Sequence, residues 1–199
     1  MVPSTAASSN LRKTYLARWI SILAHPFVMV ALLVAVPAVL QSSGDALYSL
    51  LLVGTAVVVP IALLMFRQVR RGRWSNVDAS NPSERPLLFG VALAGLVAAL
   101  LWLLLNDPHS FLVRGILVVV GFLLVAAILT HWVKLSLHVA FAALTATTLC
   151  LLGSAIGYVL AAVVPLVFWS RIVLARHRLH ELVVGLVIGV ITGIALVRL

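Results

Sequence analysis

Residues 169–181 carry the greatest concentration of chemically capable side chains in this chain. The segment reads WSRIVLARHRLHE and contains Arg171, His177 and Glu181. His177 and Glu181 are four residues apart, so they share a face if the segment is helical there. A carboxylate beside an imidazole fixes its tautomer and raises its basicity, which suits a histidine that acts as a nucleophile or a base. Arg171, one to two turns earlier, could clamp an anion.

A second polar cluster, residues 131–138, reads HWVKLSLH and leads into an apolar stretch. We expect Ser136 and His138 in the first turn of a helix, where free N–H groups and the helix dipole favour a phosphate. A hydroxyl and an imidazole at that place could complete an oxyanion site. The alternative is that Ser136 is only an N-cap residue and that Trp132 only anchors the helix at the membrane interface.

A third candidate closes the longest polar segment, residues 67–85, which ends in Glu84-Arg85-Pro86. Proline suits the first turn of a helix because its missing N–H is not needed there. We therefore expect Arg85 at a helix entrance, at the depth of the membrane surface.

Composition indicates the environment in which these clusters must work. Hydrophobic residues make up 63% of the 199 residues and charged residues 10%, whereas soluble domains carry about 25% charged residues. The chain can hold about seven apolar spans of ~20 residues each. We predict an all-α, polytopic membrane helix bundle of about seven transmembrane helices. A polar N-terminal segment, residues 1–18, would precede a single transmembrane domain that covers residues 19–199.

The predicted spans follow one another with short polar connections. Their approximate bounds are 19–40, 46–66, 87–105, 111–130, 135–152, 155–169 and 182–197. The first span contains His25-Pro26, which we interpret as a kink with a histidine that faces other protein. Glycines at positions 185, 189 and 193 predict close packing of the last span against another helix.

The formal charge of +9 could suggest a nucleic-acid partner, but the basic residues lie in short loops between apolar spans. Counting the crossings places all three polar clusters on the side of the N-terminus. All of the 14 Lys and Arg residues except Arg114 and Arg198 lie on that side. The positive-inside rule then predicts a cytoplasmic face and a plasma-membrane protein without a nucleic-acid partner. The single cysteine, Cys150, excludes an intramolecular disulfide framework.

Taken in order, the three clusters resemble the motifs of the type 2 phosphatidic acid phosphatase family of membrane lipid phosphatases. The resemblance covers residues 78–181, about half the chain. It implies a metal-independent hydrolase without a cofactor, in which His177 attacks phosphorus and forms a phosphohistidine. It also implies that Glu181 orients His177 and that His138 protonates the leaving alcohol. The implied phosphate-binding residues are Arg85, Arg171 and Ser136.

The chain departs from the family pattern at three places. Asp78 stands where the family has a lysine, seven residues before Arg85, and no proline or glycine surrounds Ser136. Glu181 replaces an aspartate that is one methylene shorter. One interpretation is that Lys134 supplies the missing cation and that Asp78 positions Lys134 or Arg85. The other is that Lys134 is an interfacial lysine that extends to the membrane surface.

Two functional hypotheses follow from these residues. The first is a lipid phosphate phosphatase that acts on a polyprenyl phosphate or pyrophosphate, a phosphatidate or a related lipid. The second is a non-catalytic membrane protein of the same fold that binds an anionic lipid or a partner protein. Phosphate release from lipid phosphates without added metal distinguishes the two.

Overall fold

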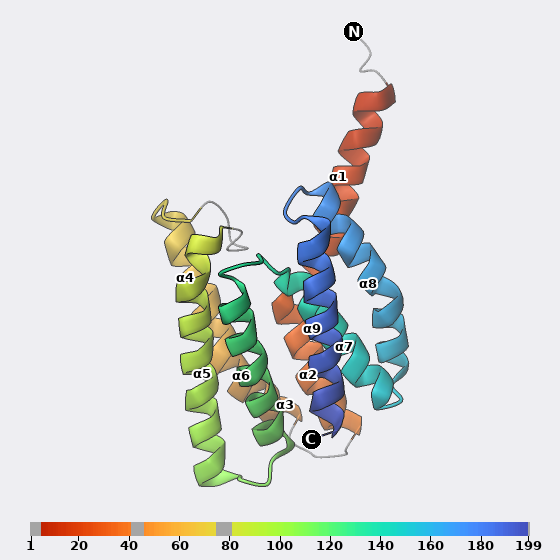
Figure 1. Cartoon of the computed structure of the whole chain (residues 1–199). Helices are drawn as coiled ribbons and strands as arrows, with labels where there is room; N and C mark the ends of the chain where they lie inside the picture. Colours follow the sequence, from red (N-terminus) through yellow and green to blue (C-terminus); the bar gives the residue numbers. More distant parts are fainter. Residues whose placement is uncertain (1–4, 41–45, 75–80, 199) are drawn as a thin grey trace. The chain divides into compact units, whose positions relative to one another are not determined.

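The computed structural model describes residues 5–40, 46–74 and 81–198, and these residues form helices and connecting loops without a strand. The all-α prediction is confirmed, and every predicted apolar span is helical (Figure 1). The polar N-terminal segment is itself helical from Thr5 onward. In chain order the elements are α1 (Thr5–Leu23), α2 (Pro26–Leu40), α3 (Ala46–Val53), the π-helical turn η1 (Gly54–Val58), α4 (Val59–Arg70), the 3-10 turn η2 (Pro82–Glu84), α5 (Arg85–Asn106), α6 (Phe111–Leu129), α7 (Leu137–Leu151), α8 (Ala155–Val173) and α9 (Leu179–Arg198).

The long apolar helices make this an integral membrane protein. Within the described ranges, five helical segments are long and apolar enough to cross a bilayer: Leu47–Arg70, α5, α6, α8 and α9. The pair Leu11–Leu23 and Pro26–Leu40, bent by 41°, makes a sixth if it counts as one broken span. The remaining predicted span, 135–152, is the 15-residue helix α7, which is shorter than the ~20 residues that a span needs. Most α7 residues are buried within the protein.

The chain divides into two compact units by its internal contacts. Unit 1 combines Met1–Val30 with Leu135–Ile194, and unit 2 combines Ala31–Lys134 with Ala195–Leu199. The single transmembrane domain that we expected over residues 19–199 stays a prediction. Each unit is described by itself below.

Unit 1 is built around α7. Helices α7 and α8 are joined by a tight turn, in which Gly153 adopts a positive φ of 71°, and they pack against each other. Helix α1 packs against α8 (Figure 1). The glycine face of α9 lies on α7, as predicted. A Cβ on Gly189 would overlap the carbonyl oxygen of Ala140, and one on Gly193 would come within 2.8 Å of the Leu144 carbonyl oxygen.

Unit 2 contains the antiparallel hairpin of α5 and α6 (Figure 1). Ser110 caps α6, because its Oγ accepts a hydrogen bond from the Leu112 N–H at 3.4 Å. Helix α5 also packs on η1, where Gly95 lies so close to the Ala56 carbonyl that no side chain would fit. This packing fixes the direction of α5, whose first residue is Arg85.

Candidate functional site

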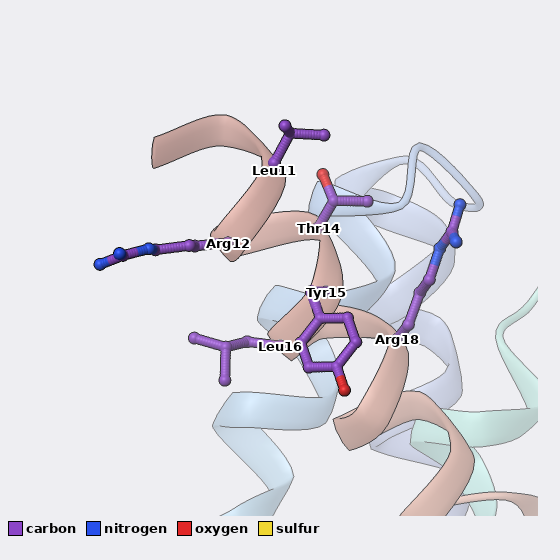
Figure 2. Close-up of a pocket in the computed structure, with 6 residues that line it drawn as sticks. All are labelled: Leu11, Arg12, Thr14, Tyr15, Leu16 and Arg18. Atoms are coloured by element: carbon purple, nitrogen blue, oxygen red, sulfur yellow. The ribbon is translucent and has the colours of Figure 1, made fainter. Parts of the chain in front are cut away.

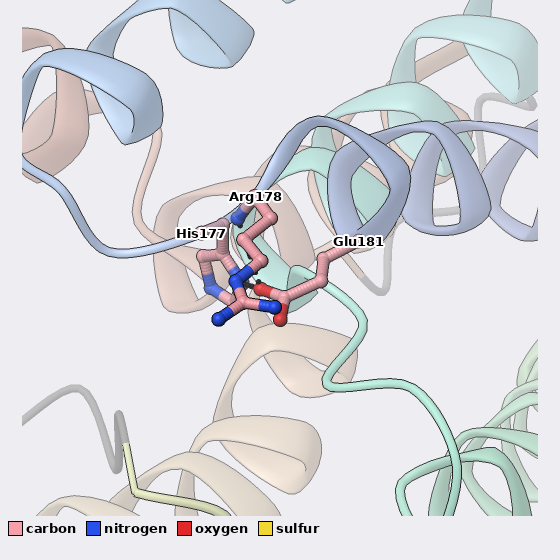
Figure 3. Close-up of polar contacts among 3 residues, drawn as sticks. All are labelled: His177, Arg178 and Glu181. Atoms are coloured by element: carbon pink, nitrogen blue, oxygen red, sulfur yellow. Dashed lines mark hydrogen bonds and ion pairs between the residues drawn. The ribbon is translucent and has the colours of Figure 1, made fainter.

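His177 and Glu181 form a direct pair where α8 connects to α9. Glu181 Oε2 lies 2.8 Å from His177 Nδ1 and also accepts a hydrogen bond from the backbone N–H of Arg178 at 3.2 Å (Figure 3). The side chains of His177 and Glu181 are only 4% and 12% exposed. His177 lies in the loop before α9, so the pair does not share a helix face. Glu181 reaches back to it from the first turn of α9.

This pairing decides which ring nitrogen of His177 can act. A carboxylate only accepts hydrogen bonds at neutral pH, so Nδ1 must carry the proton that it donates to Glu181. The lone pair of the neutral ring then lies on Nε2, which becomes the nucleophilic nitrogen. The sequence prediction that Glu181 orients His177 agrees with this geometry.

Ser136 and His138 lie at the start of α7, as the sequence predicted. Ser136 takes the N-cap position, but its side chain makes no capping hydrogen bond. Its Oγ and the Nε2 of His138 are both buried and have no hydrogen-bond partner among the described residues. Because buried polar atoms are normally paired, these two atoms point to a ligand. Ser136 therefore occupies the predicted N-cap position without the capping hydrogen bond, and its role as a phosphate-binding residue stays a prediction.

The start of α7 is fixed to the start of α9. The Ser136 backbone N–H donates to the Glu181 carbonyl oxygen at 3.2 Å. An ideal Cβ on Gly185 would lie 2.8 Å from the Ser136 carbonyl oxygen, so glycine permits this close approach. One backbone hydrogen bond thus links Glu181, a catalytic candidate, to Ser136, a phosphate-binding candidate.

Arg171 lies in the last turn of α8 and is 1% exposed. Its Nη1 donates a hydrogen bond of 2.6 Å to Ser21 Oγ, which sets the plane of the guanidinium group. Burial of a charged group is costly unless the group is compensated, so buried arginines usually serve a function. The planar fork of arginine matches the oxygens of a phosphate.

Electrostatics ties these groups into one cluster in unit 1. Arg171, Arg176, His25 and His177 all act electrostatically on His138. Two arginines and two further histidines therefore lie near the buried imidazole of His138, which favours an anionic ligand. We call His138, Ser136, Arg171, His177 and Glu181 the histidine cluster.

Sequence reasoning missed two neighbours of this cluster, which come from α1 and from the break after it. Ser21 contacts Arg171 as described, and the His25 ring lies 5.3 Å from the His138 ring, measured between centroids. A histidine inside an apolar stretch is a usable signal, since ionisable residues at membrane depth are often functional. A lone serine in a helix gives no such signal.

The other predicted site residues belong to a different part of the chain. Arg85 is the first residue of α5, in unit 2, and is 3% exposed, so its predicted position at a helix entrance is confirmed. Lys134 is half-buried and ends the long segment of unit 2. Their association with the histidine cluster stays a prediction. Asp78 lies outside the described residues.

A pocket on α1 contains none of the predicted site residues. It is lined by Leu11, Arg12, Thr14, Tyr15, Leu16 and Arg18, all from that one helix (Figure 2). Within the described residues, no group of three or more His, Cys, Asp and Glu side chains is arranged to hold a metal ion. No protein-family model, curated protein or solved structure matches the chain.

Proposed function

We propose that this protein is a membrane lipid phosphate phosphatase that forms a phosphohistidine on His177 and requires no metal. The observation that carries the proposal is the 2.8 Å contact between His177 Nδ1 and Glu181 Oε2. It leaves the Nε2 lone pair of His177 available for attack, in the same compact unit as Arg171 and His138. The motif resemblance in the sequence supports the same chemistry.

The first chemical step uses His177 as the nucleophile. Its Nε2 attacks phosphorus, the bond between phosphorus and the lipid alcohol oxygen breaks, and His138, protonated when the phosphate anion is bound beside it, gives a proton to the leaving oxygen. The Arg171 guanidinium and the Ser136 hydroxyl donate hydrogen bonds to the equatorial oxygens. Positioning and charge stabilisation of this kind supply most of the catalysis in phosphoryl transfer.

The second step releases phosphate. Water attacks the phosphohistidine, His138 takes a proton from that water, and the phosphorus–nitrogen bond breaks to restore His177. Glu181 holds the His177 ring throughout both steps.

The substrate class follows from the environment. A phosphatase site in an integral membrane bundle suits an amphiphilic substrate that stays in the bilayer, such as a polyprenyl phosphate or pyrophosphate, a phosphatidate or a related lipid. The distribution of Lys and Arg supports a plasma-membrane protein with this site at the cytoplasmic face.

One sequence feature favours a second candidate, a non-catalytic protein that binds an anionic lipid or a partner. Asp78 places a negative charge where the family has a lysine, and a carboxylate repels phosphate unless a cation pairs with it. In this second candidate function, the histidine cluster binds an anion but does not hydrolyse a substrate.

The test is phosphate release by the purified protein from a panel of lipid phosphates, with and without a chelator. The proposal expects release that persists with chelator, is abolished in His177→Ala and is unchanged in His180→Ala. His180 is the matched control because it is exposed and lies three residues away. Lipid binding without release from any substrate supports the second candidate. Release that survives His177→Ala removes His177 from the mechanism.

A further inference from the structure

His25 lies where the first apolar helix pair breaks, between the end of α1 and the start of α2. Its Nδ1 accepts a hydrogen bond from the Phe27 backbone N–H at 3.3 Å. In the neutral ring this fixes the proton on Nε2. The same ring contacts His138 edge to face, with 5.3 Å between centroids and an interplanar angle of 86°.

A second contact holds this break against α7. Thr145 Oγ1 donates to the Met29 carbonyl oxygen at 3.2 Å, and the Met29 N–H donates to the His25 carbonyl oxygen at 3.1 Å. His138 and Thr145 are seven residues apart, so they lie on one face of α7. The 25–29 segment is therefore attached to that face at two points, one of which is the imidazole pair.

We propose that His25 is a positioning residue for His138. Its ring, locked in one tautomer, holds the His138 imidazole so that Nε2 faces the leaving oxygen of the substrate. His138 Nε2 is buried and has no hydrogen-bond partner among the described residues, and the His25 ring packs edge to face against the His138 ring. The inference rests on the proposed phosphatase function. It assigns a catalytic contribution to a histidine outside the three motifs.

The expected signature is a dependence on the leaving group. An alkyl alcohol leaves poorly without a proton, whereas p-nitrophenolate leaves readily without one. In the first step, a residue that acts through the general acid matters only for the first kind of substrate. General acids contribute roughly 10²–10⁴-fold, so partial misplacement of His138 should lower the rate of the first step roughly tenfold or more with an alkyl phosphate.

The decisive variant is His25→Asn. The asparagine Oδ1 can replace Nδ1 as the acceptor for Phe27, so the helix break is kept while the ring is lost. We expect the rate of the first step, measured as the burst of leaving-group release before steady state, to fall at least tenfold with a short-chain alkyl phosphate and less than twofold with p-nitrophenyl phosphate. We also expect no further loss when His25→Asn is added to His138→Ala. His25→Gln, which places an amide near the Nε2 position, is measured in parallel in case the asparagine variant fails to fold.

Three outcomes separate the inference from the proposed function. Equal losses with both substrates would show that His25 is only structural and would overturn the inference. Parent-like rates in His25→Asn and His25→Gln, together with a leaving-group effect in His138→Ala, would overturn it while the proposed function stands. Absence of turnover in the parent protein would overturn the proposed function, and the inference with it.

Discussion

Replacement of Glu181 by glutamine is the most informative single change in the histidine cluster. Glutamine has the same shape, so its oxygen can still accept from Arg178 N–H and His177 Nδ1, which contact Glu181 at 3.2 and 2.8 Å. The change removes only the negative charge. Hydrogen bonds to charged groups contribute ~1.5–3 kcal/mol, and the histidine ring gains positive charge as it attacks phosphorus.

That energy range converts directly into a rate. At ~1.4 kcal/mol for each factor of ten, Glu181→Gln should lower kcat for lipid phosphate hydrolysis by roughly 10- to 150-fold. The stability of the protein should change by less than ~1 kcal/mol, because the contact to the first turn of α9 is kept. The assay is the initial rate of phosphate release at saturating substrate, with thermal unfolding in detergent as the folding control. A rate within threefold of the parent protein would refute the orienting role of Glu181.

Further predictions concern packing, phosphate binding and orientation. Gly185→Ala should destabilise the protein by ~1–3 kcal/mol and lower phosphate release, because the added Cβ would press on the backbone at the start of α7. The control is Gly121→Ala, which has open space around it and should change neither stability nor phosphate release. Arg171→Lys keeps the charge but loses the planar fork, so kcat/KM should fall roughly tenfold or more; a loss below twofold would contradict phosphate binding by this arginine. In a cysteine-free background, a membrane-impermeant maleimide applied to intact cells should label His109→Cys and not His180→Cys, and the reverse pattern would overturn the proposed orientation.

The sequence predicted the parts of the site that are local along the chain. The pairing of His177 with Glu181 was predicted from their separation of four residues, and it forms although His177 lies in the loop before α9 and only Glu181 lies in the helix. Arg85 followed by proline likewise identifies a helix start. Geometry of this kind depends only on residues that are close together in the sequence, so one sequence is enough to predict it.

The contributions of α1 and α2 could not be predicted in the same way. Ser21 meets Arg171, and His25 meets His138, only because distant helices pack together in unit 1. Hydropathy also predicted a span over residues 135–152, where α7 is 15 residues long and mostly buried within the protein. A helix buried in protein and a helix in lipid both need apolar side chains, and only length separates the two.

The most direct test of the central claim is to trap the phosphoenzyme. The purified protein is incubated briefly with a lipid phosphate labelled in the phosphate group, quenched in alkali and digested, and the labelled peptide is sequenced by mass spectrometry. The account predicts an alkali-stable, acid-labile phosphate on His177, which is absent from His177→Ala and accumulates when His138→Ala slows the second step. Phosphate release by the parent protein with label on another residue, or with none on His177 in either the parent or the His138→Ala protein, would contradict it.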